Sequence, residues 1–316
     1  MKRVLFLAAL MFAGGLFAAY DPFDDCADVD VILRVVDERG EPVADANAVV
    51  AYQISPEKGE VVKGMTDAQG CYATKGRCNS IVNIEVTKAG FYDSHIRESV
   101  AKEPTEKVVA TRRWTQVPVQ LTVVMKTVRK PIKMTVRSVD FKPYPATNEI
   151  VKLDLEMLEW CPPYGRGKHD DLHLVFDGWR NPREWLDFHE HLTVSMPNCV
   201  DGFYRQKIDG QSKLRYSYEA NTNVVYEKAF EFRHVMKPGG KAESKRLEKD
   251  EYLVYRVRTQ TNELGQVTHA HYGRIGEKFS QYIGLSIKSW FNPTDNDTNL
   301  ESEDVPKTRT RGNRRY

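Results

Sequence analysis

Two histidine pairs are the residues of this sequence that could hold a metal ion. His189 and His191 form one pair, and His269 and His271 form the other. Side chains alternate between the two faces of a β-strand, so each pair would place two imidazoles on one face. Two such pairs on neighbouring strands could offer four nitrogens to zinc or a similar ion. Alternation of polar and apolar residues is also typical of an ordinary solvated face. We therefore predict that the protein binds no metal and no cofactor. The alternative is a metal site formed by these four histidines.

A second group of residues combines carboxylates with aromatic rings. Such a group suits a sugar-binding cleft, because rings stack on the apolar faces of pyranoses while carboxylates accept hydrogen bonds from hydroxyls. Glycoside hydrolysis would also need two carboxylates about 5–10 Å apart across one bond. Bulky aromatic residues are equally typical of the core of any β-sandwich. The predicted ligand-binding residues are Trp160, Tyr164, Asp170, Asp171, Trp179 and Trp185.

The sequence carries no local signature of a known catalytic site. It contains no Gly-x-Ser-x-Gly, no His-Glu-x-x-His and no phosphate-cradling glycine-rich loop. Scattered Ser, His and Asp residues carry no weight without such a signature. We therefore predict a protein without catalytic activity. The alternative is a metal-assisted or carboxylate-based hydrolase in the second half of the chain, which the histidine pairs and Asp170-Asp171 motivate.

Strand patterns dominate the elements that must position these residues. Every odd position from Val117 to Met125 is apolar, which is the period-two pattern of a strand with one buried face. Turn clusters separate the later strands, and the segment 241–250 has a composition that favours one or two exposed helical turns. Short strands at this spacing predict an all-β fold, with a sandwich or jelly roll in the second half. The later predicted strands are Ile132–Val139, Ile150–Leu158, Leu172–Phe176, His191–Met196, Val224–Phe232, Tyr252–Gln260, Gln266–Tyr272 and Ile283–Trp290.

The first half carries a characteristic order of strands and turns. In VDVILRVVDERGEPV an apolar strand runs into an Asp-x-x-Gly turn with Pro-Val behind it. MTDAQGCYATKG places a Thr-Asp-x-x-Gly turn before an aromatic residue, and IVNIEVTKAGFY ends a strand in Gly-Phe-Tyr. This order resembles the transthyretin-like β-sandwich, also called the carboxypeptidase regulatory-like domain, over about residues 28–127. The resemblance implies a prealbumin-like sandwich in an exported protein, with no catalytic residues in this module.

The second half has a weaker resemblance. LDLEMLEWCPPYGRGKHDD, YRVRTQTNELGQVTHAHYGRIG and WFNPTDNDTNLE are similar to a region that follows such modules in exported bacterial proteins. That region has no assigned role, so the resemblance implies nothing about activity.

The first twenty residues read as a secretory signal peptide. Lys2 and Arg3 form a charged start, an apolar run follows over residues 4–17, and Ala18-Ala19 is a small-residue cleavage zone. The run of about fourteen residues is shorter than the roughly 20 that a membrane-spanning helix needs. We predict an exported protein that is periplasmic, on the cell surface or secreted, with no transmembrane segment after signal cleavage. An uncleaved anchor is the alternative.

The charge of the chain argues against nucleic-acid binding. The formal net charge is +2, but the last eleven residues, PKTRTRGNRRY, contribute five basic groups and no acid. Without this tail and the basic start, the body is mildly acidic, whereas nucleic-acid binding needs a basic face on the folded domain. The predicted partner is an envelope component or a polysaccharide, and the sequence predicts no oligomeric state.

Five cysteines in an exported chain predict disulfides, and the odd count leaves at least one thiol over. Cys161 and Cys199 are the two in the second half and are predicted to pair. Cys71 and Cys78 would face each other if a hairpin loop ran over residues 73–76. Cys26 could instead reach either of them. Metal binding by these thiols is not expected, because no Cys-x-x-Cys occurs.

The predicted organisation follows from these segments. A signal peptide covers residues 1–19, a transthyretin-like domain 28–127, a β-rich domain 132–293 and a polar basic tail 294–316. The second domain is expected to present a binding or structural surface at the cell envelope, with carbohydrate as the predicted ligand class.

Overall fold

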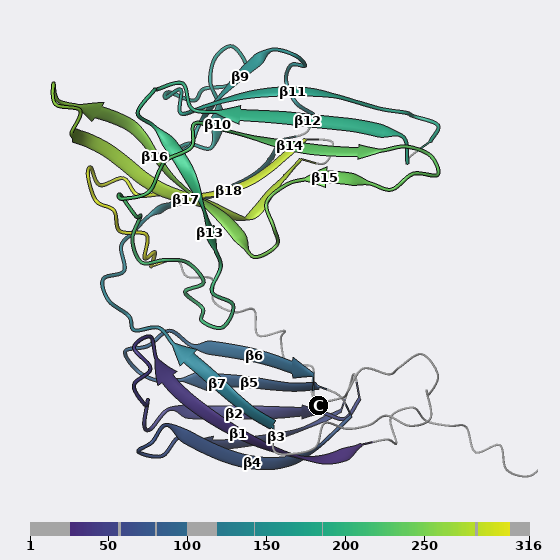
Figure 1. Cartoon of the computed structure of the whole chain (residues 1–316), viewed down its shortest axis with the longest axis vertical. Coiled ribbons are helices and arrows are strands. Elements are labelled where there is room, and N and C mark those ends of the chain that lie inside the picture. Colours follow the sequence, from purple (N-terminus) through teal and green to yellow (C-terminus); the bar gives the residue numbers. More distant parts are fainter. Residues whose placement is uncertain are drawn as a thin grey trace, which may run out of the picture. The chain divides into compact units, whose positions relative to one another are not determined.

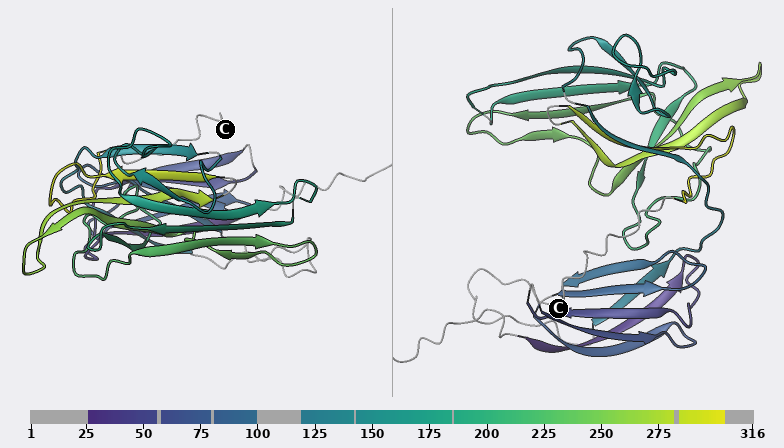
Figure 2. Two further views of the ribbon diagram at one scale, coloured as in Figure 1. Left: turned by 90° about the horizontal axis from the view of Figure 1, so that it is seen from above. Right: turned by 180° about the vertical axis from the view of Figure 1, so that it is seen from behind.

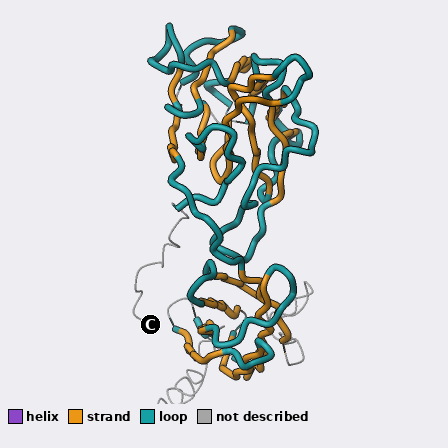
Figure 3. The backbone as a smooth tube through the Cα atoms, turned by 90° about the vertical axis from the view of Figure 1, so that its left-hand side faces the viewer, coloured by secondary structure: helices purple, strands orange, loops and turns teal. Residues whose placement is uncertain are grey.

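The computed structural model describes residues 26–55, 58–79, 81–99, 119–141, 143–184, 186–281 and 284–303. Within these ranges the chain forms 18 β-strands and no helix (Figures 1 and 3), which confirms the predicted all-β class. No helix in this part of the chain could therefore cross a membrane. The chain divides into two compact units between Met125 and Lys126, here called unit 1 and unit 2. The predicted signal peptide, most of the predicted basic tail and Trp185 lie outside the described residues.

Unit 1 is a sandwich of two sheets. The first has the strand order β4 (Cys71–Cys78), β1 (Ala27–Asp37) and β7 (Val119–Met125). Strand β1 pairs antiparallel with β4 and parallel with β7. The second has the order β3 (Gly59–Met65), β2 (Asn47–Gln53), β5 (Ile81–Thr87) and β6 (Ser94–Ser99), all antiparallel.

Alternation of apolar residues explains the core of unit 1. Alternate side chains from Val29 to Val35 of β1 and along β2 and β5 point into the space between the sheets, where they are at most 4% exposed. The predicted period-two strand is β7 over its described residues, and Val123 and Met125 are fully buried. Residues 117 and 118 of that prediction lie outside the described part.

The two Asp-x-x-Gly motifs form the same local turn. The Oδ1 atom of Asp37 accepts the N–H groups of Arg39 and Glu41, and Gly40 has φ of 85°. In the second motif, Asp67 Oδ1 accepts the corresponding two N–H groups, and Gly70 has φ of 74°. A short acidic side chain that bonds its own backbone, followed by a residue with positive φ, makes a tight turn.

Unit 2 is a larger antiparallel sandwich (Figure 2). One sheet has six strands in the order β10 (Glu159–Trp160), β9 (Ile150–Asp154), β11 (Leu172–Arg180), β12 (Phe188–Ser195), β14 (Ala229–Met236) and β15 (Glu243–Lys245). The other has five strands in the order β13 (Gly202–Lys207), β16 (Glu251–Thr261), β17 (Val267–Gln281), β18 (Leu285–Phe291) and β8 (Thr135–Phe141).

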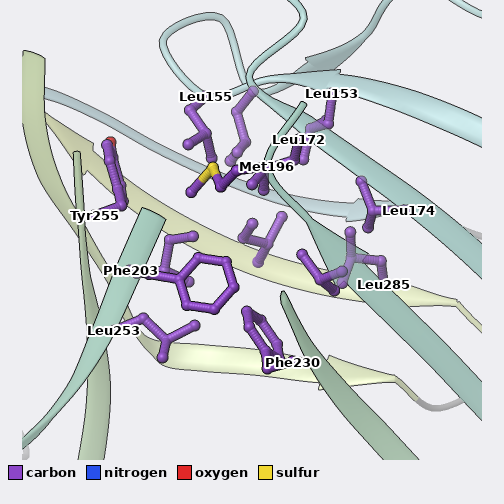
Figure 4. Packing of buried hydrophobic residues seen from close by; sticks show 14 of the residues in the cluster. Leu153, Leu155, Leu172, Leu174, Met196, Phe203, Phe230, Leu253, Tyr255 and Leu285 are labelled. Atoms are coloured by element: carbon purple, nitrogen blue, oxygen red, sulfur yellow. The ribbon is translucent and has the colours of Figure 1, made fainter. Parts of the chain in front are cut away.

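The two sheets of unit 2 enclose one apolar core. Figure 4 shows Leu172 and Leu174 of the six-stranded sheet in one cluster with Leu253 and Leu285 of the five-stranded sheet. Phe230 lies beside Phe203 in the same cluster, and their ring centroids are 4.5 Å apart. These side chains are almost completely buried, and interior packing of this density excludes water.

The second face of the five-stranded sheet is covered by the unit's own chain. Residues 208–227 and 292–303 lie on it without forming long strands. Their apolar and aromatic side chains pack on those of the sheet and form a second buried cluster. Its members include Tyr216, Ala220 and Leu300 from the covering segments and Tyr252, Val254, Tyr272 and Trp290 from the strands.

All eight predicted strands of the second half overlap an observed strand, with shifted ends. Strands β16 and β17 form a hairpin, and Gly265 at its turn has φ of 76°. The expectation of helical turns over 241–250 is wrong, because this segment contains the short edge strand β15. Three strands, β10, β13 and β15, lack the alternating apolar pattern or the length that would identify them from sequence.

The structure forms no disulfide between any of the five cysteines, all of which are described. The predicted pairing of Cys71 with Cys78 is wrong, because the two residues begin and end one strand, β4. At about 3.3 Å per residue they lie about 23 Å apart. Cys161 is buried, and its thiol donates to the carbonyl of His169 at 3.2 Å, whereas Cys199 is exposed.

Candidate functional site

The two histidine pairs lie on different sheets. His189 and His191 are on β12, whose neighbours are β11 and β14. His269 and His271 are on β17, whose neighbours are β16 and β18. The four imidazoles therefore do not meet at one ion, as the sequence alternative required. Among the residues described, no group of three His, Cys, Asp or Glu side chains could hold a metal ion.

The histidines of β17 have partners within the five-stranded sheet and its covering segment. Nδ1 of His269 lies 2.7 Å from Oδ2 of Asp295, and Nδ1 of His271 lies 3.2 Å from the carbonyl of Asn292. Burial, together with the nearby Arg258 and His269, lowers the pKa of His271 below its ordinary value. These contacts anchor residues 292–295 to the sheet edge.

The predicted sugar-binding residues do not share one surface. Trp160 is only 7% exposed and packs in the core, where its ring centroid lies 4.3 Å from that of Phe141. Tyr164 is exposed, and its hydroxyl donates to a carboxylate oxygen of Glu149 at 3.3 Å. Trp179 is exposed near the far end of β11. Trp185 lies outside the described residues.

The adjacent carboxylates Asp170 and Asp171 lie in different environments. Asp170 lies beside two bases, with Lys152 Nζ at 2.7 Å and His173 Nε2 at 3.0 Å. Asp171 is buried and accepts two hydrogen bonds from the guanidinium of Arg258, both 3.0 Å long. The pair therefore does not act on one ligand, because each carboxylate already holds a separate cation.

Arg258 connects three acidic segments of unit 2. Besides Asp171, its guanidinium donates to Glu156 at 2.7 Å and lies 3.5 Å from Asp154. Its own backbone N–H donates to Asp201, and its positive φ of 58° marks an irregularity at the end of β16. A bidentate arginine in a largely buried site fixes the geometry of the segments that it joins. No local pattern in the sequence points to this residue.

The buried aspartates near Arg258 have pKa values shifted in opposite directions. Burial alone would raise the pKa of Asp154. Three backbone N–H donors and the Arg258 guanidinium outweigh burial and hold that pKa below its ordinary value. At Asp201, burial dominates and raises the pKa, since the hydrogen bonds from Thr259 and Arg258 offset it only partly. This arrangement is what a structural ion-pair network produces.

The outer face of the six-stranded sheet is a surface that the described part of unit 2 leaves uncovered. Alternate residues of β9, β11, β12 and β14 are buried in the core, so the residues between them point outward. We call this surface the open face. Its side chains are Ile150, Lys152, His173, Val175, Asp177, Trp179, His189, His191, Thr193, Ser195, Glu231 and Arg233.

Strand register places polar groups around Trp179. Trp179 stands directly opposite His189, and one step along the sheet Asp177 stands opposite His191. His191 in turn stands opposite Arg233. Trp179 and His189 form one row across the sheet, and Asp177, His191 and Arg233 form the next row. Neighbouring strands are about 4.8 Å apart, so the row across the three strands β11, β12 and β14, which Figure 1 labels, is about 10 Å long.

The open face combines one exposed ring with two separated carboxylates. Trp179 is 53% exposed, so one side of its indole is available for stacking. Asp177 and Glu231 are two strands and two residues apart, which separates their Cα atoms by about 12 Å. Glu231 also lies 3.5 Å from Lys245 and 4.0 Å from His191.

Comparison with known proteins gives limited similarity. No protein-family model and no curated protein matches the chain. Among solved structures, 3-chlorocatechol 1,2-dioxygenase from Rhodococcus opacus is 15% identical with a TM-score of 0.24, over 33% of this chain and 62% of that one. The chain thus spans less than two thirds of the dioxygenase.

Two further solved structures are more fully covered. The shaft pilin SpaA from Lactobacillus rhamnosus GG is 8% identical with a TM-score of 0.24, over 56% of this chain and 90% of the pilin. A protein from Bacteroides uniformis described as a "putative carbohydrate binding protein" is 8% identical with a TM-score of 0.20, over 85% of this chain and 98% of that one. At these scores the similarities carry no conclusion about function.

Proposed function

We propose that this protein is an exported, non-catalytic β-sandwich protein that binds polysaccharide at the cell envelope. The open face of unit 2 is the proposed binding surface, with Trp179 as its centre. Export rests on the signal-like start of the sequence, and the cell envelope is the proposed location for the same reason.

The exposure of Trp179 is the observation that carries this proposal. Trp160 is 7% exposed and Trp290 is fully buried, whereas Trp179 presents half of its surface to solvent on a sheet strand. Leaving a large apolar ring in water forgoes the stabilisation that burial would give. Aromatic residues retained on a surface are typical of recognition sites, because a rigid ring gives a large contact area.

The residues around Trp179 have complementary roles in this proposal. The indole would stack on the apolar face of a pyranose ring. His189 and His191 can donate or accept hydrogen bonds, Asp177 accepts them, and Arg233 donates to hydroxyl or carboxylate oxygens. The register places all of them within reach of one or two sugar units.

Unit 1 is proposed to be a transthyretin-like accessory module that spaces or docks unit 2. Its seven strands in two sheets and its two Asp-x-x-Gly turns support that assignment. The proposed organisation is a signal peptide over 1–19, this module over 28–127, the binding domain over 132–293 and a basic tail over 294–316. The tail and an edge strand could add contacts to an envelope partner.

A binding screen with a matched pair of variants tests the proposal. The mature chain is tested against immobilised glycans and polysaccharides from envelope extracts, and the best ligand is titrated. Trp179→Ala should weaken binding about tenfold or more, as expected for an aromatic anchor. Leu264→Ala changes an exposed apolar residue on the hairpin of the other sheet and should leave affinity unchanged. No binding to any glycan, or equal losses in both variants, would overturn the proposal.

A hydrolase in the second domain is the alternative, and no arrangement among the described residues favours it. The histidine pairs are on separate sheets, and Asp170 and Asp171 hold separate cations. Elemental analysis of protein purified without a histidine tag tests its metal-dependent form. One tightly bound zinc per chain would support the hydrolase.

A further inference from the structure

Cys26 and Cys78 lie at the same end of the sandwich in unit 1. In the register of β1 and β4, Ala27 stands opposite Cys78, so Cys26 is one residue further along. With strands about 4.5–5.5 Å apart and a rise of about 3.4 Å per residue, the Cα atoms of the two cysteines are about 6 Å apart. Disulfides join cysteines whose Cα atoms are about 4.4–6.8 Å apart.

Both thiols point across the sandwich toward one segment of the opposite sheet. The Sγ atom of Cys78 lies 3.1 Å from the carbonyl oxygen of Ile81 and 3.5 Å from that of Gln53, both of which belong to the opposite sheet. The Sγ atom of Cys26 lies 3.9 Å from the carbonyl oxygen of Ile54, the next residue. Because the two sulfurs contact consecutive residues at the end of β2, both thiols lie on the side of the β1–β4 sheet that faces the opposite sheet. A disulfide requires the two Cβ atoms to approach each other, which thiols on one side of the sheet can do.

The other cysteine of unit 1 does not compete for either thiol. Cys71 is at the opposite end of β4, about 23 Å from Cys78 along the strand. In unit 2, burial followed by the nearby aspartates raises the pKa of Cys161 to about 11, so it is a protonated, unreactive thiol at neutral pH.

We propose that Cys26 and Cys78 are an oxidation site that forms an intramolecular disulfide with a disulfide-bearing oxidant such as a thiol–disulfide oxidoreductase or oxidised glutathione. The partly exposed Cys26 reacts first. Its thiolate attacks the disulfide of the oxidant, and one thiol leaves. The Cys78 thiolate then attacks Sγ of Cys26, and the second thiol leaves. Two protein thiols are oxidised while one disulfide of the oxidant is reduced to two thiols.

The bond closes a loop that contains the first four strands of unit 1. It ties the start of β1 to the end of β4, which restricts the unfolded chain and so stabilises the folded unit. An oxidising compartment, such as the proposed destination of this protein, preserves such bonds. The proposal does not depend on sugar binding.

Peptide mapping of the full chain tests the site directly. The reduced protein is incubated in native buffer with oxidised glutathione, quenched with iodoacetamide and digested with trypsin without reduction. The sequence places the five cysteines on five separate tryptic peptides, at 4–34, 64–75, 78–88, 153–166 and 184–205. If a leader is removed, the first peptide begins later but still contains Cys26. The expected product joins the Cys26 peptide to peptide 78–88. The buried Cys161 should be recovered alkylated, and Cys71 and Cys199 should be recovered alkylated or glutathionylated but not linked to another peptide.

Variants and thermal unfolding complete the test. Cys71→Ser should retain the link, and Cys78→Ser should leave Cys26 as a mixed disulfide with glutathione. Oxidation of the wild-type chain should raise the Tm of unit 1 by about 5 °C or more. Recovery of Cys26 and Cys78 as alkylated peptides, a link from Cys26 to Cys71, or an unchanged or lower Tm on oxidation would overturn the proposal. The wild-type map decides the matter even if a variant does not fold.

Discussion

Unit 2 contains two sheets whose second faces differ in what covers them. The open face of the six-stranded sheet carries polar side chains and the half-exposed Trp179. The corresponding face of the five-stranded sheet is covered by residues 208–227 and 292–303, and its Trp290 is fully buried. Each sheet buries its inner face in the common core, so only the outer faces distinguish the two.

The covered face shows how this chain uses aromatic rings internally. The guanidinium of Arg274 lies between the rings of Tyr216 and Trp290, at 3.6 and 3.8 Å from their centroids. The covering segment is fixed at Ser217, whose backbone N–H donates to the hydroxyl of Tyr252 at 2.9 Å. Leu300 of the second segment donates its N–H to the carbonyl of Tyr218 at 2.7 Å.

The contrast teaches that aromatic content alone does not identify a binding surface. Tyr204, Tyr216 and Tyr218 are aromatic residues like Trp179, yet all three side chains are buried. Trp179 differs because no segment of the described chain packs over it. Whether an aromatic residue is available to a ligand therefore depends on which segments of the chain cover its side chain.

The largest expected loss of stability is that of Trp290→Ala, and Trp179→Ala is the matched comparison. Trp290→Ala removes a buried ring from the covered face and should lower the free energy of unfolding by about 3–5 kcal/mol. Trp179→Ala removes a half-exposed ring and should change it by less than about 0.5–1 kcal/mol. Denaturant unfolding of both variants measures the difference. Equal losses would contradict the distinction between the two faces.

The ion pairs of unit 2 allow a second comparison. Arg258→Ala leaves Asp171 and Asp154 buried without their cation and should destabilise the unit by about 3 kcal/mol. Lys152→Ala removes the cation of a partly exposed pair on the open face and should be much less destabilising, because solvent screens that pair. Thermal unfolding at low and high salt checks both. Strong salt dependence at Arg258, rather than at Lys152, would argue against a buried network.

The two Asp-x-x-Gly turns of unit 1 have the same local structure but differ in how closely other segments approach their glycines. A methyl group on Gly70 would lie 2.3 Å from the carbonyl oxygen of Val35, whereas one on Gly40 would meet nothing within 4 Å. Both glycines have positive φ, so alanine costs about 1–2 kcal/mol at each site. Gly70→Ala adds the displacement of β1 and should be more destabilising by at least about 1 kcal/mol. Urea unfolding of the pair tests this, and equal effects would refute the close approach.

The smallest expected effect is a pH dependence from His271. Its pKa is lowered in the folded state, mainly by burial, so the unfolded chain binds a proton more readily as the pH falls below about 6.5. The free energy of unfolding should therefore decrease between about pH 7 and pH 5. His271→Gln should flatten this slope, which chemical unfolding at several pH values measures. An unchanged slope in the variant would assign the effect to other groups.

Much of the fold could be predicted from local patterns. Period-two alternation identified β7 and most strands of unit 2, because a half-buried strand must place apolar residues on one face. Asp-x-x-Gly located two turns, since only a short acceptor and a residue with positive φ close them. The short strands β10, β13 and β15 were missed, because two to six residues carry too few alternations to form a pattern.

The candidate site could be predicted only in part. Trp179 was among the predicted residues, but so were Trp160 and Asp171, which the fold buries in the core and in an ion pair. His189, Arg233 and their register with Trp179 depend on pairing between strands that are distant in the sequence. Arg258 was missed for the same reason, since the carboxylates that it holds are 87 to 104 residues away in the sequence.

The amino-acid sequence by itself determined an all-β chain, the faces of its longer strands and the two acidic turns, because these depend on neighbours a few residues apart. The tertiary structure decided which rings and carboxylates are buried, which cysteines approach each other and which sheet face is left open. Those properties depend on strand pairing and on the path of irregular segments over a sheet, which no local pattern encodes.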